Sequence, residues 1–125
     1  MIYQPHMLPK LRSDQIMAAA AGSPCTLRIA SFLPGLQCAG RETTVACHLP
    51  IGWGKGVSTK VTDMATAFGC RVCHDILDGR NIKAREYLME NHAAVLMQRY
   101  LSALTETHAL LIAEGIIVVP DAKMT

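Results

Sequence analysis

The chain has 125 residues, of which half are hydrophobic and 18% are charged, and its formal net charge is +2. This length suits one domain with a single core, and the hydrophobic content argues against an intrinsically disordered chain. No apolar run reaches the ~20 residues that a membrane-spanning helix needs, and the N-terminus lacks the apolar stretch of a signal peptide. We therefore expect a cytoplasmic protein without a membrane partner, whose weak positive charge permits a polyanionic ligand.

The first residues predict an arm followed by a short helix. Residues 1–12 contain prolines and show no hydrophobic period, so they should form a loose N-terminal arm. Ser13 or Asp14 would cap a helix over residues 14–21, whose consecutive alanines favour helix. Gly22 would end this helix.

Three segments in the middle of the chain predict strands. Residues 25–29 alternate between polar and apolar side chains, which is typical of a strand. Residues 43–48 predict a second strand because they are rich in β-branched side chains and precede a proline. A loop with alternating glycines should follow at 51–60, and then a brief strand at 64–69.

The C-terminal half predicts mainly helix. A short helix after Cys73 should stop near Gly79. Apolar residues at helical spacing then predict one long helix from about residue 82 to residue 114. Gly115 would end it, and the β-branched residues 116–119 predict a closing strand.

Five cysteines are a high number for a chain in a reducing compartment, where metal binding explains them better than disulfides. Cys70 and Cys73, separated by two residues, can bind one metal ion from a single turn. With Cys25 and Cys38 they make a four-thiolate site for structural zinc, which would join distant segments of a small domain. Cys47 could replace Cys38, and the alternative is a set of ordinary buried thiols.

The string Cys70-x-x-Cys73-His74 also matches two other kinds of site. Attachment of a c-type haem needs an exported chain, and the sequence shows no export signal. A thioredoxin-like redox pair normally follows a strand in a βαβ pattern, which we do not find in the sequence. Zinc therefore remains the favoured interpretation.

The same stretch carries groups for a reactive centre. If a helix begins near Cys70, each residue turns about 100° around its axis, so His74 and Asp78 share a face that points away from Cys73. His48 ends the second predicted strand and could act as a general base, because imidazole titrates near neutral pH. The alternative for His48 is a hydrogen-bonded histidine in a strand.

Basic side chains surround this stretch and also lie in the glycine loop. They could contact the phosphates of a nucleic acid or form a solvated surface. These residues are Lys55, Lys60, Arg71, Arg80, Lys83 and Arg85.

Several of these segments resemble a known nuclease family. A strand that ends in His48, a polar position near Asp63 and a following Cys-x-x-Cys-His string are similar to the HNH nucleases, with their ββα-metal core. The strings Cys-Thr-Leu-Arg-Ile, Glu-Thr-Thr-Val-Ala-Cys-His and Cys-x-x-Cys-His-Asp-x-x-Asp-x-Arg resemble more closely the YbcO-type nucleases of prophages. The resemblance covers residues 14–80, with a weaker echo at 114–116.

The resemblance implies roles for the matched residues. His48 would be the general base, His74 a ligand of a catalytic divalent metal, and the cysteines a structural zinc cage. Asp63 falls near the family's middle asparagine, and Cys47 stands where common HNH proteins carry a metal-binding aspartate. Asp78, one helical turn after His74, is our candidate for the second ligand of the catalytic metal.

Together these features predict an α+β fold: a zinc-stabilised, HNH-like ββα-metal domain over residues 13–125, with an added long C-terminal helix and a short closing strand. The expected function is a metal-dependent DNA endonuclease of phage or prophage type, with zinc for structure and magnesium or manganese for catalysis. The alternatives are a catalytically silent zinc module that binds nucleic acid, and a structural or regulatory phage protein whose long helix binds a protein partner.

Overall fold

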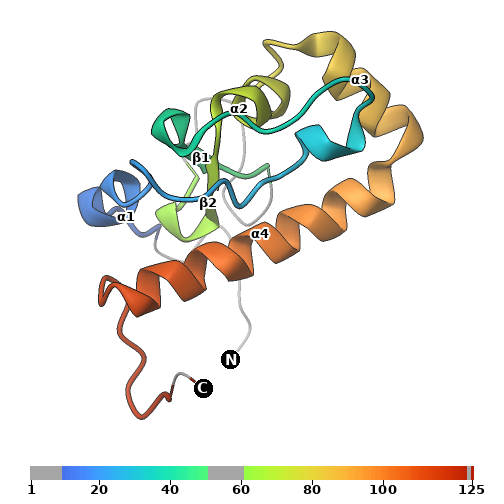
Figure 1. Cartoon of the computed structure of the whole chain (residues 1–125). Helices are drawn as coiled ribbons and strands as arrows, with labels where there is room; N and C mark the ends of the chain where they lie inside the picture. The colour runs from blue at the N-terminus through green and yellow to red at the C-terminus, as the bar shows by residue number, and fades with distance from the viewer. Residues whose placement is uncertain (1–9, 51–60, 124) are drawn as a thin grey trace.

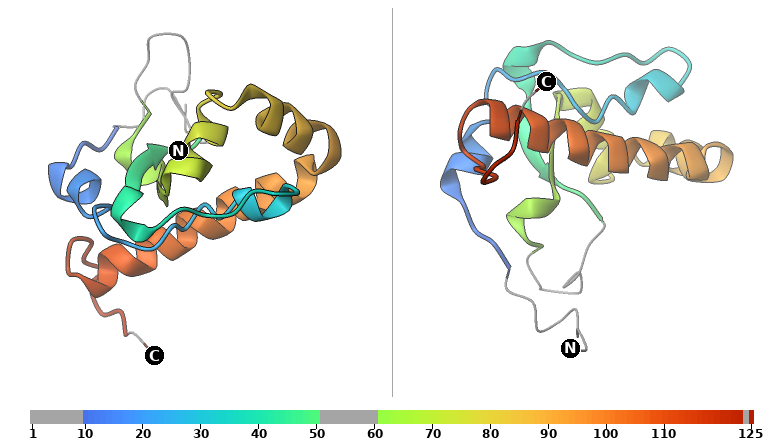
Figure 2. Two further views of the ribbon diagram at one scale, coloured as in Figure 1. Left: turned by 45° about the horizontal axis from the view of Figure 1, so that its top comes forward. Right: turned by 90° about the horizontal axis from the view of Figure 1, so that it is seen from below.

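The computed structural model describes residues 10–50, 61–123 and 125, which form a mixed α and β structure (Figure 1). Within this part of the chain, a two-stranded sheet and several short helices lie along one long C-terminal helix, α4 (Ala93–Ala113) (Figure 2). The predicted α+β class and the long C-terminal helix are confirmed. Most of the expected N-terminal arm and the whole glycine loop, with Lys55 and Lys60, lie outside the described residues.

The sheet consists of β1 (Val45–His48) and β2 (Thr66–Gly69), which pair antiparallel with His48 opposite Thr66. The strands predicted at 43–48 and 64–69 are thus confirmed in their C-terminal parts. The residues just before each strand form short 3₁₀ turns instead of extended backbone.

Both faces of β2 are buried. Ala67 belongs to the main core, whereas Phe68 packs into a smaller cluster with Ile16 and Leu111. Successive side chains of a strand point to opposite faces, so β2 can contribute to two hydrophobic clusters at once. This burial fixes the hairpin, and with it the end of β1, relative to the helices.

Helix α2 (Arg71–Leu77) begins directly after β2, with Cys70 as its N-cap. Cys70 Sγ accepts a hydrogen bond from Cys73 N at 3.5 Å. The helix ends before Gly79, whose φ of +85° favours glycine. The predicted helix and its end near Gly79 are therefore confirmed, although the helix begins at Arg71, before Cys73. The helix contacts both strands of the sheet.

The long helix predicted at 82–114 is two helices, so this prediction is wrong. Helices α3 (Ile82–Asn91) and α4 meet at His92, whose φ of −139° and ψ of 28° are not helical. The His92 ring stacks on the Phe32 ring, with centroids 6.2 Å apart. No glycine or proline marks the break, so tertiary packing overrides a continuous helical pattern.

Helix α4 presents one face to the interior. Its buried side chains recur every three or four residues, as expected for a helix packed on one side. They are Leu96, Tyr100, Ala103, Thr107 and Leu111. No helix in residues 10–50 or 61–123 combines the length and the apolarity needed to cross a membrane.

Residues 25–29 do not form the predicted strand. Thr26 N and Leu27 N both donate to Phe68 O, at 2.7 and 3.1 Å, so the segment touches β2 at one carbonyl without building a ladder. Arg28 has a φ of +47°, a left-handed conformation that interrupts an extended backbone. Thr26, Leu27 and Ile29 are all buried, so burial in this loop does not follow the alternation of polar and apolar side chains.

Residues 116–119 do not form the predicted closing strand. Gly115 has a φ of +75°, after which Ile116 N and Ile117 N donate back to Leu111 O at 2.9 and 3.2 Å. These bonds satisfy a carbonyl left free at the end of α4. Ile116 and Ile117 therefore close the helix and pack on the smaller cluster, whereas Val118 and Val119 are exposed.

Helix α1 (Asp14–Ala18) has Ser13 as its N-cap, and the Ser13 Oγ accepts a hydrogen bond from Ile16 N at 3.2 Å. The predicted helix and cap are confirmed, although the regular helix ends at Ala18 and turns lead on to Gly22, with a φ of +76°. Helix α1 contacts β1 and so packs against the β1–β2 hairpin.

Candidate functional site

Four cysteine sulfurs converge at the start of α2. Cys70 and Cys73 come from this helix terminus, while Cys25 and Cys38 approach from loops that are distant in sequence. The four Sγ atoms lie within 4.8 Å of one another, and Cys38 Sγ is 3.7 Å from Cys73 Sγ. A tetrahedral zinc ion with ~2.3 Å bonds would hold its sulfurs about 3.8 Å apart, so this thiol cluster could hold such an ion.

Backbone N–H groups point at three of these sulfurs. Such hydrogen bonds stabilise a thiolate and orient it as a ligand. The donors are Arg28 N to Cys25, Ala30 N to Cys73, and Ala39 N and Cys73 N to Cys70, at 3.4 to 3.5 Å.

Two of the four thiols have a pKa raised above the ordinary value of a cysteine. A hydrogen bond with Cys73 lowers the pKa of Cys25 to about 5, while burial and the Cys25 charge raise the pKa of Cys38 to about 12. The hydrogen bond to Cys25 and burial raise the pKa of Cys73 far above its ordinary value. Since the thiolate is the form that binds metal, a bound cation would supply the charge that Cys38 and Cys73 require.

Cys47 lies apart from this cluster. It is buried in β1, and its Sγ is 3.5 Å from Val45 O. Burial, with the Cys25 charge, raises the pKa of Cys47 to about 12. The structure thus brings Cys38, and not Cys47, to the other three sulfurs.

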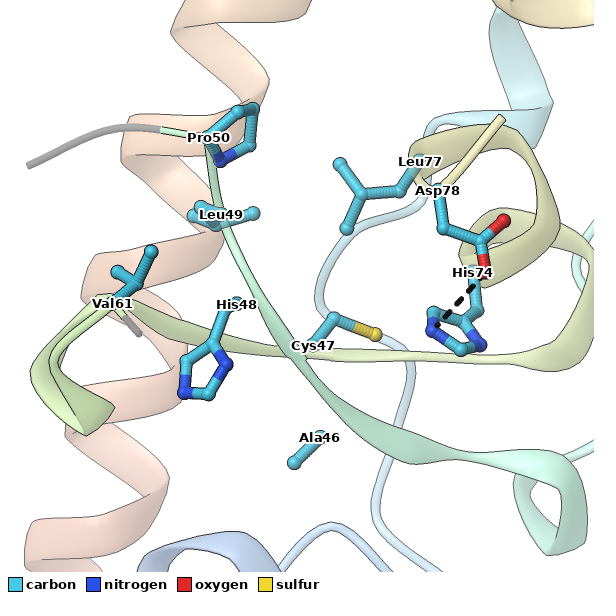
Figure 3. A pocket seen from close by; sticks show the side chains of 9 residues that line it. All are labelled: Ala46, Cys47, His48, Leu49, Pro50, Val61, His74, Leu77 and Asp78. Atoms are coloured by element: carbon cyan, nitrogen blue, oxygen red, sulfur yellow. Dashed lines mark ion pairs between the residues drawn. The ribbon is translucent and has the colours of Figure 1, made fainter. Parts of the chain in front are cut away.

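A cleft of about 330 Å³ opens between β1 and the last turn of α2 (Figure 3). His48 borders it from the strand, and His74 and Asp78 border it from the helix, so the three residues predicted as catalytic line one cleft. The other lining residues are Ala46, Cys47, Leu49, Pro50, Val61 and Leu77.

His74 and Asp78 face each other on α2, as their spacing of four residues predicts. His74 Nε2 lies 3.7 Å from Asp78 Oδ2, and each side chain is 30% exposed (Figure 3). Arg80 Nε also contacts Asp78 Oδ2, at 3.2 Å. An imidazole and a carboxylate at this separation could share a divalent cation and leave positions open for water or substrate.

His48 contacts a carboxylate to which the sequence pattern assigns no role in the site. Its Nε2 lies 2.9 Å from Oδ1 of Asp63, a residue in the 3₁₀ turn before β2. The Asp63 residue is only 5% exposed. Its one signal in the sequence is its place near the middle asparagine of the family, because no spacing rule connects it with His48.

Asp63 is held from several directions. Its Oδ2 accepts a hydrogen bond from Ser13 N at 2.7 Å, and Arg12 Nη1 lies 3.7 Å from its Oδ1. Burial raises the pKa of this carboxyl, but the Ser13 hydrogen bond, the His48 contact and the Arg12 charge outweigh burial. The pKa of Asp63 is therefore below its ordinary value, and the group is ionised at neutral pH.

A family model described as "Putative nuclease YbcO" matches residues 14–111. The chain belongs to this family. It is 36% identical over 62 residues to "Putative nuclease YbcO" of Escherichia coli strain K12 and to "Putative nuclease ybcO" of Enterobacteria phage 82. Each match covers 50% of this chain and 60% of the relative's length. No solved structure matches the chain.

The YbcO match confirms the family resemblance and extends it beyond residue 80. It begins at α1 and continues into α4, so it includes both strands, all four cysteines of the thiol cluster and every described residue of the cleft. The HNH subtype is a finer assignment than this match makes.

The predicted phosphate-contacting residues that are described lie on the surface. Arg80 is paired with Asp75 at 3.6 Å as well as with Asp78, so it stands beside the cleft of this YbcO-family chain. The exposed members of this basic group are Arg71, Arg80, Lys83 and Arg85.

Proposed function

We propose that the chain is a metal-dependent DNA endonuclease with an HNH-like ββα-metal site. The cleft carries this proposal, because it sets His48 of β1 opposite His74 and Asp78 of α2. The elements β1, β2 and α2 follow one another and contact each other, as the HNH resemblance implies. Membership in the YbcO family supports a nuclease function in general.

The chemistry required is attack on a phosphodiester, whose negative charge repels nucleophiles. His74 and Asp78 would hold a divalent ion, magnesium or manganese, which when bound stabilises charge on the phosphate and on the departing oxygen. His48 would accept a proton from the attacking water. Arg80, which already contacts Asp78, would pair with a phosphate beside the cleft.

We also propose that the thiol cluster holds a separate, structural zinc ion. The distances between its sulfurs, their N–H partners and the four-cysteine donor set support zinc over the hard cations, which prefer oxygen ligands. Zinc here would tie the loops that carry Cys25 and Cys38 to the start of α2. It would thereby support the helix that carries His74 and Asp78.

The proposal includes the phage or prophage type and the cytoplasmic, single-domain organisation expected from the sequence. The relative from Enterobacteria phage 82 supports the phage type. DNA is the proposed partner.

Nicking of supercoiled plasmid tests the proposed function. We expect the wild type to nick DNA when magnesium or manganese is added and to stop when the ion is chelated. His48→Ala should lose on the order of 10²–10⁴-fold in rate, because it lacks the general base.

His92→Ala is the matched control, because it also removes an imidazole but from a residue that does not line the cleft. Loss of the stacking on Phe32 should lower its melting temperature, but at a temperature where it is folded it should nick DNA at close to the wild-type rate. If His48→Ala nicks as fast as the wild type, the nuclease proposal is wrong, and a silent zinc module that binds nucleic acid takes its place.

A further inference from the structure

We propose that Asp63 is a positioning residue that holds His48 with its proton on Nε2, so that Nδ1 is the atom that accepts a proton from water. The catalytic half of this inference rests on the proposed nuclease function. The positioning half rests on the contacts of Asp63 and His48 alone.

The direction of the hydrogen bond follows from the charge of Asp63. An ionised carboxylate has acceptor sites and no donor, so His48 Nε2 must donate across the 2.9 Å contact. A neutral imidazole with its proton on Nε2 has its free lone pair on Nδ1. Figure 3 shows Nδ1, the His48 ring nitrogen bonded to Cγ, on the side of Cys47 and His74. The free lone pair therefore belongs to the nitrogen nearer the cleft.

The Asp63 carboxylate cannot easily turn away from His48. Its second oxygen accepts the Ser13 N–H at 2.7 Å, and its backbone N donates to Leu11 O at 2.9 Å. Leu11 N in turn donates to Thr62 Oγ1 at 3.0 Å. The His48 side chain is 35% exposed and the Asp63 side chain is buried, so the fixed Asp63 carboxylate orients the accessible His48 ring.

Among the described residues, Asp63 is the group that hydrogen-bonds the His48 ring. Arg12 Nη1 lies 3.7 Å from Asp63 Oδ1, the oxygen that His48 also contacts, and His74 and Asp78 line the other wall of the cleft. We therefore expect the orientation of His48 to depend on Asp63 more than on the residues proposed to bind the divalent ion.

The substitution Asp63→Asn gives a sharp test, because an amide has one acceptor and one donor. Ser13 N is a fixed backbone donor, so it should take the amide oxygen. The amide N–H₂ would then face His48 Nε2 and force this nitrogen to accept, which moves the ring proton to Nδ1. That tautomer cannot take a proton from water through Nδ1, a loss known from the wrong tautomer in Ser-His-Asp triads.

The experiment combines nitrogen-15 NMR of labelled histidines with plasmid nicking. The Nε2–H tautomer is expected in the wild type, the Nδ1–H tautomer in Asp63→Asn, and no imposed tautomer in Asp63→Ala. The kcat of Asp63→Asn should fall by on the order of 10²–10⁴-fold with little change in KM, and further than that of Asp63→Ala.

Asp121→Asn is the matched control, because it makes the same chemical change at an exposed position near the C-terminus. It should leave both the tautomer and the rate unchanged. The inference fails if His48 keeps the Nε2–H tautomer in Asp63→Asn, or if this variant nicks DNA as fast as a wild type that depends on His48. If the wild type nicks no DNA, the proposed function fails, and the tautomer still decides whether Asp63 holds the ring.

Discussion

Removing His74 or Asp78 should affect activity differently from removing His48. The first two are proposed metal ligands, so His74→Ala should lose activity and recover part of it at high manganese concentration. Asp78→Asn should behave like His74→Ala, because the two side chains face each other on α2. His48→Ala should show no such recovery, because the divalent ion still binds when the base is missing.

A manganese titration of each variant measures this difference. Zinc content and thermal stability should stay near the wild-type values, since these side chains are partly exposed and lie outside the thiol cluster. Rescue of His48→Ala by manganese, together with none for His74→Ala, would show that the two histidine roles are reversed.

The lowered pKa of Asp63 also predicts how the stability of the fold changes at acid pH. Its pKa in the folded chain is below its ordinary value, so the ionised carboxyl stabilises the native state above about pH 4. This contribution is lost as the pH falls through the lower, folded-state pKa. Urea unfolding at a series of pH values should therefore show a weaker decline of stability below pH 4 in Asp63→Asn than in the wild type. Parallel declines would mean that this carboxyl does not contribute.

At the scale of elements, the start of α2 and the loops around it depend on the thiol cluster. Cys38→Ser should lower the zinc content below one ion per chain and reduce the melting temperature. Cys47→Ser is the matched control and should keep its zinc, because Cys47 lies apart from the other four sulfurs. Metal analysis of the purified variants measures this, and folded wild type without zinc would contradict the proposed structural ion.

The β1–β2 hairpin makes a second prediction at this scale. A methyl group added at Gly69 would lie 2.7 Å from Leu27 Cδ1 and 2.9 Å from Cys47 Sγ, closer than van der Waals contact allows. Gly69→Ala should therefore destabilise the fold by about 1–3 kcal/mol through overpacking. Urea unfolding measures the change. A stability equal to that of the wild type would show that Leu27 and Cys47 can move to make room for the methyl group.

Elements with local signals were predictable from sequence. The end of α2 has Gly79 in a left-handed conformation, and α1 has a serine cap. The break at His92 has no such signal, because it depends on stacking against a ring from a distant turn. Residues 25–29 and 116–119 carry strand-like composition, yet neither segment pairs as a strand. Thr26 N and Leu27 N share the distant Phe68 O, a contact that depends on the tertiary structure, whereas Ile116 N and Ile117 N close the end of α4 on Leu111 O.

The candidate site also contains some contacts that the sequence could predict and others that it could not. The helical period predicted that His74 and Asp78 share a face. The cysteine pattern predicted a four-thiol cluster but left Cys38 and Cys47 as alternatives for one sulfur, and the structure brings Cys38 to the other three. The contact between His48 and Asp63 could not be predicted from spacing, because it joins the end of β1 to a turn fifteen positions later.

At the scale of the whole molecule, the exposed basic side chains Arg71, Arg80, Lys83 and Arg85 predict salt-dependent binding to DNA. Each neutralised phosphate releases counterions, so affinity should fall steeply as salt rises. Replacing Arg80 and Lys83 with glutamate should weaken binding and reduce the salt slope by about one for each phosphate that is no longer neutralised. Lys123→Glu, an exposed charge reversal near the C-terminus, should leave the slope nearly unchanged. An affinity that does not vary with salt would identify the basic group as a solvated surface.

Cys70 has two structural roles: it is the N-cap of α2 and a member of the thiol cluster. If the cluster holds zinc as we propose, metal uptake and initiation of this helix are thermodynamically linked. A newly synthesised chain would then carry His74 and Asp78 on an unfixed helix until zinc arrived. Zinc supply would set the moment at which the cleft becomes competent, and a cell short of zinc would accumulate the protein in an inert form.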